Sequence, residues 1–216
     1  MDMAPDASTR AVMRIEDVRA LRARQFPEDS GPMAHPIRPE SYQEINNFYT
    51  MTVYEKGAEV IRMLQTILGR EGFAEGLAEY IRRHDGKAAT CDDFLAAMAD
   101  ANRTDLRQFS LWFSQAGTPR VAVTTHYDPK EHTYTVLATQ MTPPTPGQSI
   151  KAPLVIPISV GLVDSHGVDL PLTLSGEPTC QDTTRTLLLT EESMSWMFVN
   201  VPEQPVLSLG RGFSAP

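Results

Sequence analysis

The main helix of this chain is predicted from one stretch of sequence, Tyr54-Glu-Lys-Gly-Ala-Glu-Val-Ile-Arg-Met-Leu64. Apolar residues recur in and around it at the spacing of one helix face; they are Val53, Val60, Ile61, Met63, Leu64, Ile67 and Leu68. The pattern predicts a helix that starts at Thr52, whose hydroxyl can cap it, and runs to Leu68. Gly69 stands where a left-handed C-terminal stop is expected. So wide an apolar face indicates a helix that is buried on much of its circumference.

Further helices are predicted on both sides of this one, from apolar residues at helical spacing and from local start and stop signals. Residues 8–24 carry an apolar stripe at three-residue steps, formed by Val12, Ile15, Val18 and Leu21. The four prolines of 27–40 predict an extended loop instead. The remaining helices are expected at 71–84, from the capping signal Thr90-Cys-Asp-Asp93 onward, and at 105–115. The first 117 residues are therefore interpreted as an α domain, or as part of one.

The periodicity changes after Gly117-Thr-Pro119, where apolar and polar residues begin to alternate. Alternation with turn residues every ten positions or so is typical of antiparallel strands. The predicted strands lie at 120–126, 133–140, 154–163, 168–174, 184–190, 195–201 and 206–209. Short strands of this kind over about a hundred residues favour a β-sandwich. The expected fold is α+β in two domains, 1–117 and 118–216.

Composition limits the class of protein and its partners. The chain has 216 residues, of which 41% are hydrophobic and 21% charged, as in an ordinary globular protein. Its 19 basic and 27 acidic residues give a formal charge of −8, which argues against a nucleic acid or an anionic membrane as partner. No run reaches the ~18–20 apolar residues that span a bilayer, and no secretion signal is recognised. With two cysteines only, Cys91 and Cys180, a cytoplasmic location is expected.

Tyr54 is the residue in the helical run that can carry chemistry. It lies in the first turn, near the positive end of the helix dipole, where a phenol can donate a hydrogen bond to a developing oxyanion. The alternative on residues alone is a half-buried tyrosine with its hydroxyl in water. Gly57 costs roughly 1 kcal/mol relative to alanine inside a helix, so it needs a reason, such as close approach of another backbone or a substrate.

The run around Tyr54 also carries a resemblance. It matches Tyr-x-Lys-Gly-x-x-Val-x-x-Met-Leu of the zinc-dependent aminopeptidase N family. Phe109-x-x-Trp-x-x-Gln-x-Gly-x-Pro-x-Val121 is similar to the end of that family's catalytic domain. Met33-Ala-His-Pro-Ile-Arg-Pro39 and Asn46-Asn-Phe-Tyr-Thr50 resemble the bacterial alanyl aminopeptidase branch. The resemblance covers nearly the whole chain.

The resemblance implies an architecture and three site residues. Residues 1–117 would be the helical C-terminal part of a thermolysin-like catalytic domain, and 118–216 an antiparallel Ig-like β-sandwich. Tyr54 matches the catalytic tyrosine that stabilises the tetrahedral intermediate, whereas Tyr49 and Asn46 match positions near the substrate pocket. The implied partners are peptide substrates and the remainder of the parent chain.

The histidines depart from the family's zinc site. None of His35, His84, His126, His132 and His166 lies in His-Glu-x-x-His, and the family's downstream glutamate ligand and Gly-x-Met-Glu-Asn segment are also missing. His126 and His132 flank a predicted hairpin turn and could lie across from each other, but a pair is not a metal site. Zinc is therefore expected in the full-length parent and no metal in this chain.

Two functions are compatible with the sequence. The first is a fragment of a zinc metallo-aminopeptidase that releases N-terminal amino acids from peptides and to which this chain contributes the oxyanion-stabilising tyrosine. The isolated chain is then expected to be inactive. The alternative is a non-catalytic binding module derived from an aminopeptidase, with a β-sandwich and a helical part. The complete match at Tyr54 favours the fragment, because a binding module has no need of that residue.

Overall fold

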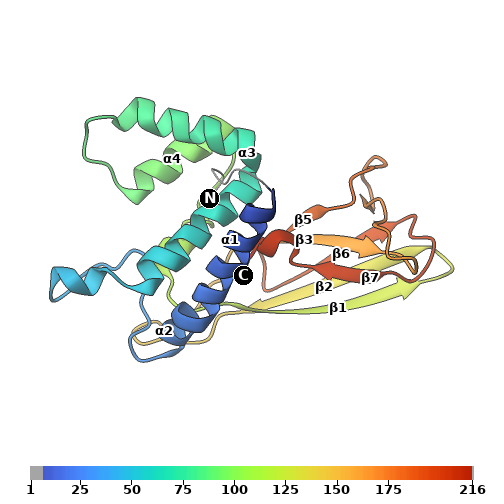
Figure 1. Cartoon of the computed structure of the whole chain (residues 1–216), viewed down its shortest axis with the longest axis horizontal. Helices are drawn as coiled ribbons and strands as arrows, with labels where there is room; N and C mark the ends of the chain where they lie inside the picture. The colour runs from blue at the N-terminus through green and yellow to red at the C-terminus, as the bar shows by residue number, and fades with distance from the viewer. Residues whose placement is uncertain (1–6, 216) are drawn as a thin grey trace.

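Helices occupy the first half of the chain and strands the second in the computed structural model, which describes residues 7–215 (Figure 1). The predicted α+β class is therefore confirmed. The helical elements are α1 (Ala7–Ala20), the π-helical turn η1 (Leu21–Gln25), α2 (Phe26–Ser30), the 3-10 turn η2 (Ile45–Phe48), the π-helical turn η3 (Thr52–Lys56), α3 (Gly57–His84), α4 (Cys91–Asn102), α5 (Leu111–Ser114) and the 3-10 turn η4 (Arg211–Phe213).

The N-terminal helix is longer than predicted. It continues from α1 through η1 and α2 to Ser30, so the predicted loop 27–40 is wrong for its first residues. Pro27 is the second residue after the π-helical turn η1, and as a proline inside a helix it lacks the amide that would donate to the preceding turn. Of the predicted apolar stripe, Val18 and Leu21 are buried, whereas Val12 and Ile15 are exposed.

The helix predicted from Thr52 is present, but its cap is a different residue. Thr50 Oγ1 accepts a hydrogen bond from the Val53 amide at 3.1 Å. The Thr52 hydroxyl is buried and donates instead to Glu28 Oε1 at 2.5 Å. Gly69 has the expected positive φ of 73°, with ψ of 169°, yet α3 resumes beyond it and ends at His84. Thr52 is thus bound by tertiary structure, and Gly69 marks a kink within a longer helix.

Helix α4 starts as predicted. Thr90 Oγ1 accepts from the Asp93 amide at 3.2 Å, and Asp93 Oδ2 accepts from the Thr90 amide at 2.8 Å, which completes a capping box. The helix predicted at 105–115 is reduced to α5. The Asp105 carboxylate accepts from the Arg107 amide at 2.9 Å, a local bond that competes with helix formation.

Two antiparallel sheets form the second half, as the alternation predicted. Their strands are β1 (Arg120–Asp128), β2 (Thr133–Met141), β3 (Ile156–Val163), β4 (Thr173–Leu174), β5 (Arg185–Leu189), β6 (Ser193–Val199) and β7 (Val206–Leu209). One sheet has the order β1-β2-β6-β4 and the other β5-β3-β7. The strand predicted at 168–174 is paired as β4 only over its last two residues.

The helical part and the sheets are joined by side chains as well as by the backbone. Trp112 Nε1 donates to the Val155 carbonyl at 2.8 Å, and Gln108 Nε2 donates to the Thr190 carbonyl at 2.6 Å. Helix α3 contacts β3 and β5 directly, so the helical part packs against the second sheet. Buried apolar residues of both halves therefore belong to one continuous core, from Val60 in α3 to Phe198 in β6.

Candidate functional site

Tyr54 and Tyr49 lie together on the surface of the helical part. Their rings stack with centroids 6.0 Å apart and an interplanar angle of 22°. Tyr54 is 57% exposed and Tyr49 is 61% exposed. Both phenols are therefore open to a molecule that approaches from outside, and the two rings form one aromatic surface.

Asn46 belongs to the same surface through the backbone. Its carbonyl accepts from the Tyr49 amide at 3.3 Å. It lies in η2, which projects from the helical part (light blue in Figure 1). The turn is stabilised by Asn47, whose Oδ1 accepts from the Glu44 amide at 3.0 Å. The structure thus places the three residues named from the sequence in one exposed region.

Tyr42 and Phe48 extend this region and were not named from the sequence. Their rings meet edge to face, with centroids 6.0 Å apart. Tyr42 is exposed. A run of aromatic residues near an expected substrate position is the signal that could have identified them. Such rings offer apolar area with polar hydroxyl groups at the edge.

Lys56 lies on the opposite side of the turn that carries Tyr54. It is buried, and its Nζ donates to Asp29 Oδ2 at 2.7 Å and to the Gly117 carbonyl at 2.9 Å. Asp29 Oδ1 accepts from the Gly117 amide at 3.3 Å, and Asp29 Oδ2 accepts from the Thr118 hydroxyl at 2.9 Å. Sequence reasoning missed Asp29 because it lies in a segment expected to be an extended loop.

The electrostatics of the pair follow from burial and charge. Burial by itself raises the pKa of Asp29, but the Lys56 charge and the hydrogen bonds that the carboxylate accepts outweigh it. The pKa of Asp29 therefore lies below its ordinary value of 3.8. Burial pulls the pKa of Lys56 down, and the Asp29 carboxylate opposes that effect. With its carboxylate ionised, Asp29 is a full partner for the lysine.

A second group of polar side chains holds the start of the same turn. Gln25 Nε2 donates to Thr52 Oγ1 at 3.2 Å, and the Thr52 amide donates to Glu28 Oε1 at 2.9 Å. His35 Nε2 lies 3.7 Å from Glu28 Oε1. Both ends of η3, Thr52 and Lys56, are therefore bonded to the segment 25–29.

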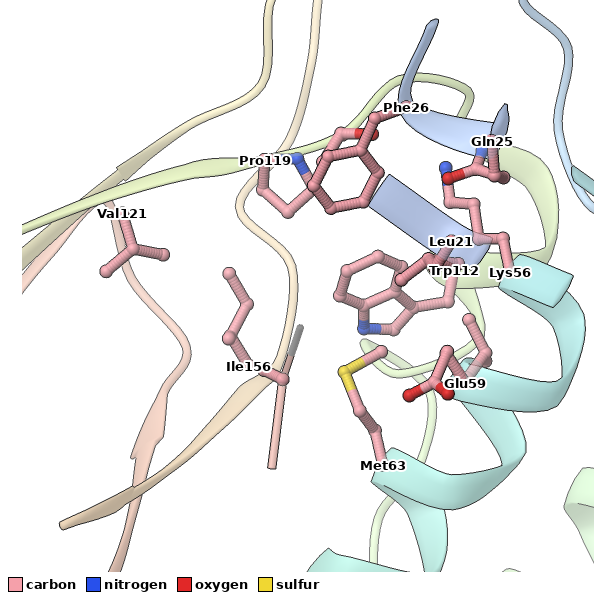
Figure 2. Close-up of a pocket in the computed structure, with 13 residues that line it drawn as sticks. Leu21, Gln25, Phe26, Lys56, Glu59, Met63, Trp112, Pro119, Val121 and Ile156 are labelled. Atoms are coloured by element: carbon pink, nitrogen blue, oxygen red, sulfur yellow. The ribbon is translucent and has the colours of Figure 1, made fainter. Parts of the chain in front are cut away.

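A cavity of about 250 Å³ lies beside this network, between α3 and the sheets (Figure 2). It is lined by Leu21, Gln25, Phe26, Lys56, Glu59, Val60, Met63, Trp112, Thr118, Pro119, Val121, Ile156 and Ala215. Tyr54 does not line it. Its two charged lining residues, Lys56 and Glu59, are already paired, with Asp29 and with Arg14 respectively. The cavity is an apolar gap in the packing and lies apart from the aromatic surface.

Within residues 7–215, no three histidine, cysteine, aspartate or glutamate side chains lie close enough together to hold a metal ion. His126 pairs with Thr135 across the β1–β2 hairpin, while His132 lies in the turn with a φ of 52°. The suggestion that these two histidines face each other is therefore wrong. In the same part of the chain no helix has the length and apolar composition needed to cross a membrane.

The sequence matches two known domains. The Peptidase family M1 domain matches over residues 3–113. A domain of unknown function with an Ig-like fold (DUF3458) matches over residues 117–216.

The chain belongs to peptidase family M1.

Similar proteins agree with this family over the whole chain. Aminopeptidase N of Escherichia coli (strain K12) is 50% identical over 215 residues, which is 100% of this chain and 24% of the relative. Aminopeptidase N of Haemophilus influenzae is 48% identical over the same shares. A crystal structure of Legionella pneumophila aminopeptidase A in complex with aspartic acid superposes with a TM-score of 0.71 at 28% identity, over 93% of this chain and 23% of that one.

The predicted relation to the bacterial aminopeptidase N branch is confirmed by these matches. This chain spans about a quarter of the length of the curated relatives.

Proposed function

We propose that this chain is the part of a zinc-dependent aminopeptidase that supplies the oxyanion-stabilising tyrosine, Tyr54. The parent enzyme would release N-terminal amino acids from peptides. The observation that carries the proposal is the contrast within one turn: Tyr54 is 57% exposed, while Lys56, two residues later, is 6% exposed and fixed by buried hydrogen bonds. A rigidly mounted donor that faces outward is what an oxyanion site needs.

The chemistry of Tyr54 follows from its place in the helix. It lies near the N-terminal end of the helix, where unpaired amides give the helix a partial positive charge. Its hydroxyl can donate a hydrogen bond to the oxygen that becomes negative when the scissile carbonyl turns tetrahedral. Such a bond is stronger in the transition state than in the ground state, so it raises kcat. Tyr49 and Asn46, on the same exposed region, are assigned to substrate binding.

The described residues do not fit a zinc site, because their histidines and carboxylates form no group of three or more. We assign the metal ligands and the general base of the parent enzyme to residues outside this chain. Residues 1–117 are proposed to be the helical part of the catalytic domain, and 118–216 the sandwich domain. A cytoplasmic location stays a prediction, consistent with the two free cysteines, Cys91 and Cys180.

The test of Tyr54 is Tyr54→Phe in the full-length parent enzyme. The expected result is a decrease in kcat of roughly 10²–10³-fold with KM nearly unchanged, because one oxyanion donor is lost. Tyr80→Phe is the matched control, since this partly buried tyrosine lies near the other end of α3, against His84 and Phe94, away from the aromatic surface. An unchanged kcat for Tyr54→Phe would remove this residue from the mechanism and favour the non-catalytic binding module.

The substrate-binding residues have a separate signature. Tyr49→Ala and Asn46→Ala should raise KM more than they lower kcat, because contacts made equally in the ground state and the transition state contribute uniform binding. Initial rates measured against peptide concentration separate the two parameters. A KM equal to that of the unmodified enzyme in both variants would contradict the assignment.

The assignment of the zinc ligands to residues outside this chain gives a further test. The purified 216-residue chain should contain no stoichiometric zinc and should release no amino acid from peptides. Zinc content is measured by elemental analysis, and activity with an amino-acid amide that carries a chromogenic leaving group. Zinc-dependent activity in the chain alone would contradict the proposal that the ligands lie elsewhere in the parent.

A further inference from the structure

We propose that Lys56 and Asp29 are positioning residues that fix the phenol of Tyr54 through the π-helical turn between them. The inference rests on the proposed function, because it concerns how the donor of that reaction is held in place. Neither residue reaches the exposed aromatic surface, since both side chains are buried. They act on the reaction only through Tyr54.

The turn that carries Tyr54 is unusual in its hydrogen bonding. The Gly57 amide donates to the Thr52 carbonyl five residues earlier, which makes 52–56 a π-helical turn. Such turns are rare and occur mostly as single turns at functional sites. Because an α-helical turn is the ordinary state of the backbone, a wider turn needs support from outside the helix. The rotation of this turn sets the direction in which Tyr54 points.

The support is present at both ends of the turn. At its start, Thr52 is fully buried and bonded to Gln25 and Glu28. At its end, Lys56 donates to Asp29 and to the Gly117 carbonyl. Three segments of the chain therefore meet behind Tyr54: residues 25–29, the turn 52–56 and the backbone at Gly117. Gly117 lies just before β1, so the network also connects the turn to the start of the sandwich.

Stability alone does not explain why this support is an ion pair. A buried pair of charges is often no more stabilising than apolar side chains of similar volume. What the charges add is directed hydrogen bonds, since Lys56 Nζ and the Asp29 carboxylate have several partners at defined distances. A defined geometry matters most where a reacting group must be placed accurately, and a displacement of 1 Å can cost about 10²-fold in rate.

A second buried pair on the same helix supplies a matched control. Arg14 Nη2 donates to Glu59 Oε2 at 2.7 Å, and both side chains are less than a tenth exposed. Arg14 also donates to the Phe213 carbonyl at 2.9 Å. This pair joins α1 to α3 as Lys56 and Asp29 join α2 to η3, but it lies beyond the π-helical turn. It tests what the loss of any buried pair on this helix does.

The experiment uses the full-length parent enzyme with Lys56→Met and Arg14→Met, each in the normal and the Tyr54→Phe background. Lys56→Met should lower kcat by about 10–100-fold with KM nearly unchanged. In the Tyr54→Phe background the same change should lower kcat by less than about threefold, because the group it positions is already absent. Arg14→Met should change kcat by the same factor in both backgrounds.

Several results would overturn the inference. An unchanged kcat for Lys56→Met, or an equal loss in both backgrounds, would make the pair structural only. If Lys56→Met does not fold, Asp29→Asn takes its place, because it keeps the side-chain volume and removes the charge. A normal kcat in Tyr54→Phe, or no aminopeptidase activity in the unmodified parent, would instead refute the proposed function itself. Both of these outcomes are measured in proteins that keep Lys56, so a failure of the proposed function is distinguished from a failure of this inference.

Discussion

The ammonium of Lys56 and the carboxylate of Asp29 lie 2.7 Å apart in the interior of the helical part, although 27 residues separate them along the chain. The same ammonium donates to the Gly117 carbonyl, 61 residues further on. One buried cation thus joins α2, the turn of Tyr54 and the backbone just before β1. The exposed tyrosine and the helix-to-strand junction are therefore parts of one hydrogen-bonded unit.

Asp29→Asn should destabilise the chain by about 3–5 kcal/mol at neutral pH, because it leaves the Lys56 ammonium buried without its counter-charge. The free energy of unfolding is measured in urea. Glu16→Gln is the control, since Glu16 pairs with Arg19 on the surface. An exposed pair of this kind is worth only about 0–1 kcal/mol. A loss at Asp29 no larger than the loss at Glu16 would show that the buried pair contributes little.

The same variant should change how stability depends on pH. The pKa of Asp29 in the folded protein lies below its ordinary value of 3.8. The unfolded state therefore binds the proton more tightly, and the stability that Asp29 contributes is present above pH 3.8 and lost as pH falls through the folded pKa. The stability gap between the unmodified chain and Asp29→Asn should narrow on acidification. A gap that widens at low pH would contradict this sign.

Two glycines of α3 should respond to alanine in opposite ways. A Cβ added at Gly57 would meet no atom within 4 Å, so Gly57→Ala should stabilise the chain by about 0.5–1 kcal/mol. A Cβ at Gly76 would lie 2.3 Å from Met98 Sδ and 3.1 Å from Met98 Cα, so Gly76→Ala should destabilise by about 1–3 kcal/mol. Thermal unfolding of the two variants provides the comparison, and equal effects would refute it.

The open space around Gly57 tests the reason that the sequence suggested for this glycine. A helical glycine suggested that a backbone or a substrate approaches closely. Within residues 7–215 no other part of the chain fills that space. The close approach of another backbone in the described chain is therefore excluded as the reason for this glycine.

A further prediction concerns Gly161 in β3 and Arg211 in η4. A Cβ at Gly161 would lie 1.9 Å from Arg211 Cζ. The guanidinium is held there by bonds to Ser208, Asp169, Thr183 and Thr184. Gly161→Ala should thus destabilise the sandwich by about 1–3 kcal/mol. In an Arg211→Ala background most of that loss should disappear, and additive losses in a double-mutant cycle would show that the two residues are independent.

Local patterns predicted most of the elements. The Thr90 capping box, the alternation of β1 and β2, and the positive φ of Gly69 all depend on neighbours along the chain, and all are found. The exposed position of Tyr54 agrees with a role toward an outside molecule, and that role stays a prediction. Tyr54 was identified as a candidate catalytic residue chiefly by the resemblance to a family and not by periodicity.

What the sequence did not reveal depends on distant contacts. Thr52 was expected to cap its own helix, but a carboxylate 24 residues away, on Glu28, binds its hydroxyl. Asp29 was placed in a loop, since nothing next to it indicates that Lys56 and Gly117 lie against it. The segment predicted as one strand at 168–174 changes partners along its length: Leu170 donates to the Leu162 carbonyl of β3, whereas Thr173 and Leu174 pair with β6. Such contacts form between segments that only the fold brings together.

Gln140 is another residue of this kind, and it supports the last prediction. From the sequence it ends a strand before a proline-rich loop. In the structure its side chain is buried, with Nε2 donating to the carbonyls of Leu154 at 2.8 Å and Glu191 at 3.1 Å, and Oε1 accepting from the Leu154 amide at 2.9 Å. The amide group therefore connects β2 to the segments that flank the opposite sheet.

Gln140→Leu should destabilise the chain by about 1–3 kcal/mol for each backbone group that it leaves buried without a partner. The neighbouring Thr139→Val is the control, because Thr139 is exposed on the other face of β2 and should change stability by no more than about 0.5 kcal/mol. Amide hydrogen exchange adds a local measurement, since the Leu154 amide should exchange faster in Gln140→Leu alone. Unchanged protection at Leu154, together with an unchanged free energy of unfolding, would mean that other contacts hold the two sheets together at this point.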